Sequence, residues 1–210
     1  MPKIKLTTKQ VLERTKEMIS WAEFGYKTLH SNSVKDKKAG LVNVIVFGRA
    51  VTNVLQKLKT TEPNFELWYK AYVDEMETDP LMKYFYNLRS AILKAGQPLN
   101  LSSSTFINHF SSADFARIPL PPPNVKIKGF FMGDNLGGNG YEIELSDGSI
   151  EHYYIDIPSD IGRTILSFEN PPSSHLGKPL TDYSIDNLSR LYLDYLQRML
   201  KDANARFDKK

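Results

Sequence analysis

Apolar residues recur at intervals of three and four along most of the first hundred residues, which is the spacing of amphipathic helices. The pattern predicts a first helix over 7–29, opened by a capping box in which Thr7 and Gln10 bond each other's backbone. It predicts a second helix over 39–59 that is apolar around most of its circumference and is therefore central. The polar positions left on this second helix form one stripe: Arg49, Asn53 and Gln56. We expect this stripe to face solvent or a partner.

Two shorter helices follow in the pattern. Asn64 precedes a third helix, and Asp79 precedes a proline at the start of a fourth, an arrangement typical of an N-cap. Gly96 ends the fourth helix, as a glycine after the last turn commonly does. Four helices with short connections predict an antiparallel bundle over 7–96.

The segment 97–124 is rich in serine and proline but carries many apolar residues. We expect it to be a packed connection that lies across the bundle, with one short strand within 105–110. Alternating polar and apolar residues then predict a small antiparallel meander over 125–168, in which 163–168 adds a fourth strand.

The clearest hairpin signal is the run YEIELSDGSIEHYYIDI, where two alternating segments flank Asp147 and Gly148. This residue pair is typical of a two-residue type I′ turn. Such a turn would place Tyr141 on the same face as His152 and Tyr154. His152 would then be a structural residue of the apolar face.

Ser184 precedes a last helix over 184–206, whose apolar stripe is wide enough to dock on the bundle. The sequence therefore predicts one α+β domain over 1–210. It consists of an antiparallel bundle of about five helices, with the small β-meander inserted before the last of them.

Composition narrows the chemistry. The net charge of +3 is too small to indicate a nucleic-acid protein without a basic cluster, and the absence of cysteine excludes disulfides and thiolate chemistry. A chain without cysteine suits a reducing compartment, so we expect a cytoplasmic protein. We found no apolar run near the roughly 20 residues that a membrane helix needs, and expect no membrane partner.

Several candidate sites fail on their spacing. The loop GDNLGGNG lacks the Gly-Lys-Ser/Thr end of a phosphate-binding loop and precedes a strand, so we predict that it is a turn between strands. The four histidines are too scattered for a metal site, and we expect neither metal nor cofactor. Three alternating carboxylates, Glu75, Glu77 and Asp79, could seat a cation, but they also describe a solvated helix end, which we favour.

The end of the fourth helix, MKYFYNLRSAILKAG, resembles the HEPN superfamily of helical-bundle proteins. Their motif is an arginine, four to six residues and then a histidine. Here Arg89 is followed by Ser90, and Lys94 stands where the histidine would be. The resemblance implies a homodimer that binds RNA or a nucleotide through these three residues without metal.

The lysine also argues against ribonuclease activity. The family's histidine is taken to move a proton, and an ordinary lysine with a pKa near about 10.4 is a poor base at neutral pH, although it can still hold a phosphate. We therefore assign no catalytic residue and do not expect an enzyme. In the plain structural alternative, Arg89 pairs with a carboxylate and Lys94 complements the helix dipole.

Two other functions stay open at this point. The second half, with GFFMGDNLGGNGYEIELSDGSIEHYYIDIP, SSHLGKPL and LYLDYLQRML, resembles bacterial proteins with the same order of segments, from which no activity carries over. The main alternative is a non-catalytic protein–protein interaction domain that uses an aromatic surface: Trp68, Tyr69, Tyr72 and Tyr84. The third is small-molecule binding between the bundle and the sheet.

Overall fold

The chain is seen in a computed structural model that describes residues 6–31, 33–134 and 138–208. The predicted α+β class is confirmed, with a helical bundle, small antiparallel sheets and a closing C-terminal helix. The chain divides into two compact units. One comprises the chain up to Leu29, 39–99 and the chain from Asn170 onward, and the other comprises 30–38 and 100–169. A single domain over 1–210 stays a prediction.

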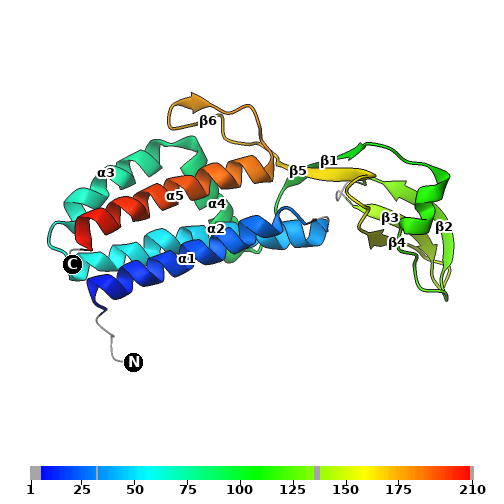
Figure 1. The fold of residues 1–210 in the computed structure, drawn as a ribbon, viewed down its shortest axis with the longest axis horizontal. Helices are drawn as coiled ribbons and strands as arrows, with labels where there is room; N and C mark the ends of the chain where they lie inside the picture. Colours follow the sequence, from blue (N-terminus) through cyan, green and yellow to red (C-terminus); the bar gives the residue numbers. More distant parts are fainter. Residues whose placement is uncertain (1–5, 32, 135–137, 209–210) are drawn as a thin grey trace. The chain divides into compact units, whose positions relative to one another are not determined.

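The first unit contains the helical bundle (Figure 1). Its elements are α1 (Thr8–Thr28), α2 (Val34–Leu55, the first residues of which belong to the second unit), a 3-10 helix (Gln56–Thr60), α3 (Phe65–Thr78), α4 (Pro80–Ala95) and α5 (Ile185–Phe207). A short hairpin, formed by β6 (Ser174–His175) and β7 (Lys178–Pro179), precedes α5.

Most helix ends follow the sequence signals, but α2 begins at Val34, five residues before the predicted start, and Asn64 forms no side-chain cap hydrogen bond. The capping box of Thr7 and Gln10 is present, and Ser184 accepts a hydrogen bond at the start of α5. Asp79 caps α4 by accepting from the backbone N–H of Met82, and Gly96 ends the same helix with φ = 60°. Local capping chemistry therefore determines where these helices begin and end.

Two glycines let α1 and α2 approach each other closely. A Cβ atom at Gly25 would lie 2.6 Å from the backbone oxygen of Gly40 and 2.7 Å from the Cβ of Asn43. A Cβ at Gly40 would likewise lie 2.6 Å from the oxygen of Gly25. Because the nearest atom in each case is a backbone oxygen of the other helix, any side chain here must push the helices apart.

We expect Gly25→Ala to lower the free energy of unfolding by about 1 to 3 kcal/mol, the usual cost of overpacking. Urea denaturation followed by circular dichroism measures this change. The control is Ser20→Ala on the exposed side of the same helix, which should be nearly neutral. Equal stability of the two variants would contradict the close approach of the helices.

The helix α2 is strongly apolar, as predicted. By length and composition alone, the stretch Val34–Thr60 could cross a membrane, and 44% of its most apolar window is buried inside the structure. The central helix of a folded bundle meets the same criteria. The expectation of no membrane partner stays a prediction.

The second unit contains two antiparallel sheets. One has the order β2 (Lys126–Met132), β3 (Asn139–Glu144) and β4 (Ile150–Ile155), which is the predicted meander. The other pairs β1 (Leu101–Ile107) with β5 (Gly162–Phe168). The prediction that 163–168 forms a fourth strand of the meander is therefore wrong. Part of the predicted glycine-rich turn, residues 135–137, lies outside the described residues.

The predicted two-residue turn is also wrong by one residue. Leu145 and Ser149 close the turn through a hydrogen bond of 2.9 Å, which leaves a three-residue loop with Gly148 at φ = 84°. A shift of one residue moves every side chain of a strand to the other face. Tyr141 accordingly faces the same side as Tyr153, its partner in the ladder, and His152 lies on the opposite, exposed face.

The serine- and proline-rich connection contributes its apolar residues to the second unit. Ile118, which is 3% exposed, forms a buried cluster with Tyr141 and Ile143, and Phe110 packs against it. A 3-10 helix (Ser112–Arg117) lies between these two residues of the connection. We had expected this segment to pack on the bundle, and these contacts instead cover the apolar face of the meander.

Candidate functional site

The three residues of the HEPN-like motif lie on α4 as separate features. Arg89 and Ser90 are half-buried and Lys94 is exposed. Within the described parts of the chain, Arg89 forms no ion pair. The alternative in which Arg89 pairs with a carboxylate is therefore wrong for these residues. The helix is regular to Ala95, so Lys94 lies about 140° around it from Arg89. One chain therefore does not bring these two cations together.

Ser90 and Lys94 instead continue a polar stripe that the sequence reading overlooked. Lys83, Asn87, Ser90 and Lys94 are spaced four, three and four apart on α4, and residues at such intervals share one helix face. The first two members of this stripe line a cavity in the bundle. The motif residues Ser90 and Lys94 thus extend the same face by two further turns.

This bundle cavity has a volume of about 560 Å³, within the range of small-ligand sites. Four α-helices and the first 3-10 helix contribute to its wall, which has an apolar part and a polar part. Its lining residues are Arg49, Thr52, Gln56, Tyr69, Val73, Met76, Glu77, Met82, Lys83, Tyr86, Asn87 and Tyr192. Two of the three residues in the polar stripe predicted for the second helix therefore line this cavity: Arg49 of α2 and Gln56 of the 3-10 helix.

Arg49 is the most informative residue of the bundle cavity. Its guanidinium carbon lies 5.2 Å from the centroid of the Tyr86 ring, and its Nη1 donates a hydrogen bond to the hydroxyl of Thr52. It is half-buried, yet among the described residues it has no carboxylate partner. A partly desolvated arginine usually pairs with an anion, because its charge is costly to bury alone. The cavity therefore offers an open position to a negatively charged ligand.

The floor of the bundle cavity is formed by uncharged tyrosines. Tyr192 is 4% exposed and stacks on Phe85 with ring centroids 4.2 Å apart. Burial raises the pKa of Tyr192, and the charge of Arg49 opposes this only in part. Burial also raises the pKa of Tyr69, whose hydroxyl oxygen accepts a hydrogen bond of 3.3 Å from Gln56. Both rings therefore stay neutral at physiological pH.

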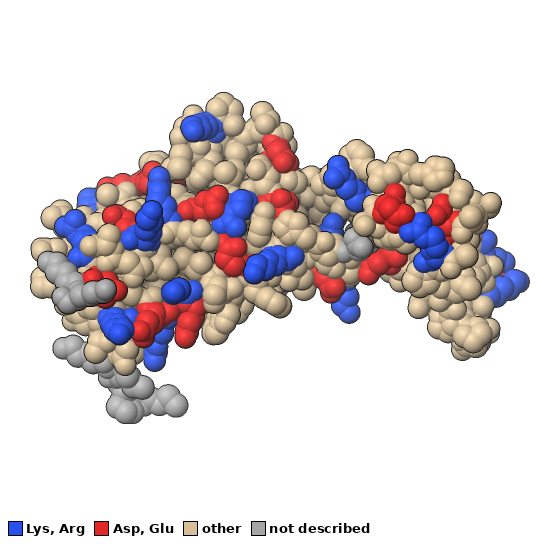
Figure 2. Space-filling view, viewed as in Figure 1, with Lys and Arg blue, Asp and Glu red and all other residues tan. Residues whose placement is uncertain are grey.

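The bundle cavity is also lined by charged and aromatic side chains. Arg49 and Lys83 supply two positive charges against the single carboxylate of Glu77. Tyr86 is 51% exposed, so part of its ring is free to stack on a base. Figure 2 shows acidic and basic side chains interspersed over the visible face of the bundle. On the face shown, the charged side chains do not form a broad basic surface.

Of the three alternating carboxylates of 75–79, Glu77 is exposed and Glu75 is half-buried, as at a solvated helix end, but the N-cap Asp79 is buried. Asp79 is 5% exposed and bonds the backbone of Met82 and Leu176 and the ring of His175. Glu75 accepts hydrogen bonds from Tyr195 and Arg198 of α5. Among the described residues, no group of three or more His, Cys, Asp or Glu side chains could hold a metal ion.

The predicted aromatic surface is largely part of the core. Trp68 and Tyr69 are 9% and 8% exposed, and Trp68 donates a hydrogen bond of 2.9 Å to Asp202 of α5. The hydroxyl of Tyr72 donates a hydrogen bond to the same carboxylate. Burial and, after it, this hydrogen bond raise the pKa of Tyr72 to about 12. These rings dock α3 on α5, so they do not form the exposed patch that a protein partner would require.

Together, the fold and the cavity define an α+β protein whose helical bundle contains a cavity lined by Arg49 and Lys83. A family model described as bacteriophage lambda protein ea47 matches residues 34–112, which is less than half of the chain. The match covers every lining residue of the bundle cavity except Tyr192. No curated protein and no solved structure matches the chain significantly.

Proposed function

We propose that this protein is a HEPN-like, metal-independent binder of RNA or nucleotides, and that the bundle cavity is its binding site. The observation that carries the proposal is Arg49, a half-buried arginine over an exposed tyrosine ring with no acidic partner among the described residues. A phosphate would pair with Arg49 and Lys83, while a base stacks on the free face of Tyr86.

The polar stripe of α4 extends from the cavity toward the C-terminal end of the helix. Ser90 and Lys94 would hold a further phosphate of a single-stranded RNA that leaves the cavity along the helix. Arg89 lies about 140° away from Lys94 on the helix, so it would contribute only across a homodimer, which the HEPN resemblance implies. Ribonuclease activity is not part of the proposal, because Lys94 replaces the family's histidine.

Fluorescence anisotropy of a labelled single-stranded RNA tests the proposal. We expect Arg49→Met to weaken binding at least about tenfold, the usual cost of losing a charge-assisted hydrogen bond. Arg14→Met removes the same charge from an exposed position of α1 and should change affinity far less. Raising the salt concentration should weaken wild-type binding more than binding by Arg49→Met.

The same assay separates the cavity from the motif. We expect Arg89→Ala to weaken binding less than Arg49→Met does. A large loss with Arg89→Ala alone would move the site to the end of α4, as the motif by itself suggests. Absence of RNA and nucleotide binding in the wild type would refute the proposed function in both forms.

A further inference from the structure

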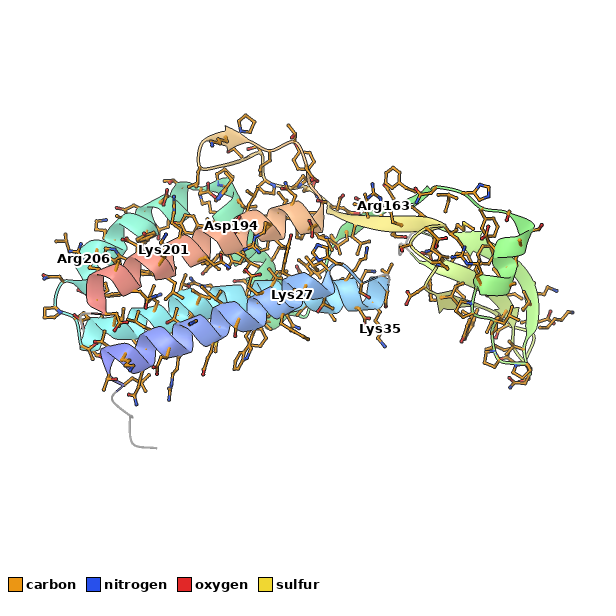
Figure 3. The ribbon with its side chains drawn as sticks, in the orientation of Figure 1. Lys27, Lys35, Arg163, Asp194, Lys201 and Arg206 are labelled. Atoms are coloured by element: carbon orange, nitrogen blue, oxygen red, sulfur yellow. The ribbon has the colours of Figure 1, made fainter. Side chains whose placement is uncertain are left out.

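A second cavity in the bundle unit is built around a buried histidine. This hairpin cavity has a volume of about 530 Å³ and lies between the β6–β7 hairpin, the segment that follows it and one face of α5. Its lining residues are His175, Leu176, Lys178, Pro179, Leu180, Thr181, Asp182, Asn187, Leu191, Asp194, Tyr195 and Arg198. Figure 3 labels Asp194 on α5. None of these residues lines the bundle cavity.

Asp79 determines which tautomer the His175 ring adopts. The Nδ1 atom of His175 lies 3.0 Å from Oδ1 of Asp79, whose other oxygen accepts 2.6 Å from the N–H of Leu176. Burial alone would raise the pKa of Asp79, but these bonds and the N–H of Met82 hold it below its usual value. Because the ionised carboxylate accepts a hydrogen bond from Nδ1, the neutral form of the imidazole has its proton on Nδ1 and its lone pair on Nε2.

That lone pair is available to a ligand. His175 is 8% exposed, and its Nε2 has no hydrogen-bond partner among the described residues. The Nε2 atom is nevertheless not fully enclosed by protein. It is therefore accessible from the cavity that His175 lines. A residue so deeply buried, with one nitrogen anchored and the other open, is a fixed hydrogen-bond acceptor.

Cationic groups lie on the same side of this cavity. Lys178 pairs directly with His175 in the hairpin ladder, and opposite residues of a ladder project to the same face. Lys178 forms no ion pair within the described parts of the chain. Arg198 donates a bond of 2.9 Å to Glu75 and lies over the Tyr195 ring, 4.8 Å from its centroid, and a guanidinium has five N–H donors in all. Together these two cations suit a single carboxylate.

The rest of the lining determines what else the ligand carries. Two carboxylates, Asp182 and Asp194, also line the cavity, so a dianion such as phosphate is disfavoured. Asp194 accepts a hydrogen bond from Arg190 and Asp182 accepts one from the N–H of Ser184, each through Oδ1. Their remaining oxygens, with the lone pair of His175, favour an N–H donor that is itself positively charged. Leucine and proline side chains form the remaining apolar surface. We infer that the hairpin cavity binds a free amino acid with an apolar side chain.

In this arrangement, the ammonium group donates to Nε2 of His175 and lies near the carboxylates, and the ligand carboxylate accepts from Lys178 and Arg198. The backbone of the hairpin supports such a site. Leu176 has φ = 48°, a left-handed conformation that is uncommon outside glycine, and Asp79 bonds its N–H. The bond to Asp79 holds this turn beside His175, so the acceptor stays in place.

Titration of L-leucine, followed by the imidazole nitrogen signals of His175 in nuclear magnetic resonance, tests the inference. We expect saturable binding at least tenfold tighter than that of 3-methylbutylamine, which lacks the carboxylate, or of 4-methylpentanoate, which lacks the amine. Equal binding of all three compounds would show only an apolar hollow and overturn the inference. So would the absence of any saturable shift, or tighter binding of inorganic phosphate.

Three variants complete the test. His175→Asn keeps a donor near the position of Nδ1 for Asp79 but removes Nε2, and Lys178→Met removes the exposed cation; each should weaken leucine binding at least tenfold. Lys201→Met, on an exposed position of α5 outside the cavity (Figure 3), should bind like the wild type. Wild-type affinity in folded His175→Asn, with folding verified by thermal melting, would overturn the inference.

Discussion

Replacing Asp79 by alanine is expected to lower the free energy of unfolding by about 3 kcal/mol, because the change strands several buried donors at once. The carboxylate caps α4 through Met82 at 2.9 Å, bonds His175 at 3.0 Å and holds the N–H of Leu176 at 2.6 Å. Chemical denaturation at neutral pH measures the loss. Asp79→Ser is the matched variant, since serine is a good N-cap and should recover about 1 kcal/mol of it.

The effect of Asp79 should also depend on pH. In the folded protein the pKa of Asp79 lies below the value of about 3.9 that an unfolded chain has. The contribution of Asp79 to the free energy of unfolding is therefore fully present above about pH 3.9. It is lost as the pH falls through the lower, folded pKa. The difference between the wild type and Asp79→Ala should therefore shrink in acid. A difference that grows as the pH falls would contradict the bonding described here.

The second large effect is expected at Tyr192. This ring is 4% exposed, stacks on Phe85 at 4.2 Å and forms the floor of the bundle cavity. Tyr192→Ala should cost about 3 to 5 kcal/mol, the range for truncating a buried aromatic side chain. A Cβ atom at Gly48 of α2 would lie only 2.4 Å from the same ring, so the neighbouring helix packs directly on it.

Tyr192→Phe is the control for this prediction. The hydroxyl of Tyr192 has no hydrogen-bond partner among the described residues, so its removal should leave stability within about 1 kcal/mol of the wild type. Thermal denaturation of the two variants makes the comparison. If phenylalanine destabilised the protein as much as alanine, the hydroxyl rather than the packed ring would carry the stability.

Local signals predicted the bundle well. Capping residues such as Thr7, Asp79 and Ser184 act within a few residues of the chain, so the sequence alone indicates where their helices begin. The wide apolar surface of α2 likewise indicated a central helix. Strand pairing was harder: β5 pairs with β1, about 60 residues earlier in the chain, and no local pattern specifies such a partner.

The meander shows how a small local error changes a whole surface. Asp147 and Gly148 were correctly placed in a turn, but a loop of three residues instead of two moved His152 to the exposed face. The turn pair favours a tight hairpin but does not exclude the longer loop. Its length depends on the strand register that the rest of the sheet imposes.

The site was predictable only in part. The α2 stripe was visible, and two of its members, Arg49 and Gln56, line the bundle cavity. Lys83 and Asn87 were overlooked, although their spacing to Ser90 and Lys94 was a signal available in the sequence. The pairing of Asp79 with His175, 96 residues later in the chain, depends on tertiary structure and leaves no such trace.

The most direct measurement of the central claim follows the arginine side-chain N–H signals of the protein while a single-stranded RNA is added. If RNA binds in the bundle cavity, the Nε–H signal of Arg49 shifts and saturates, whereas that of Arg206, near the end of α5 (Figure 3), stays in place. An unchanged Arg49 signal, with RNA bound elsewhere or not at all, would contradict the account.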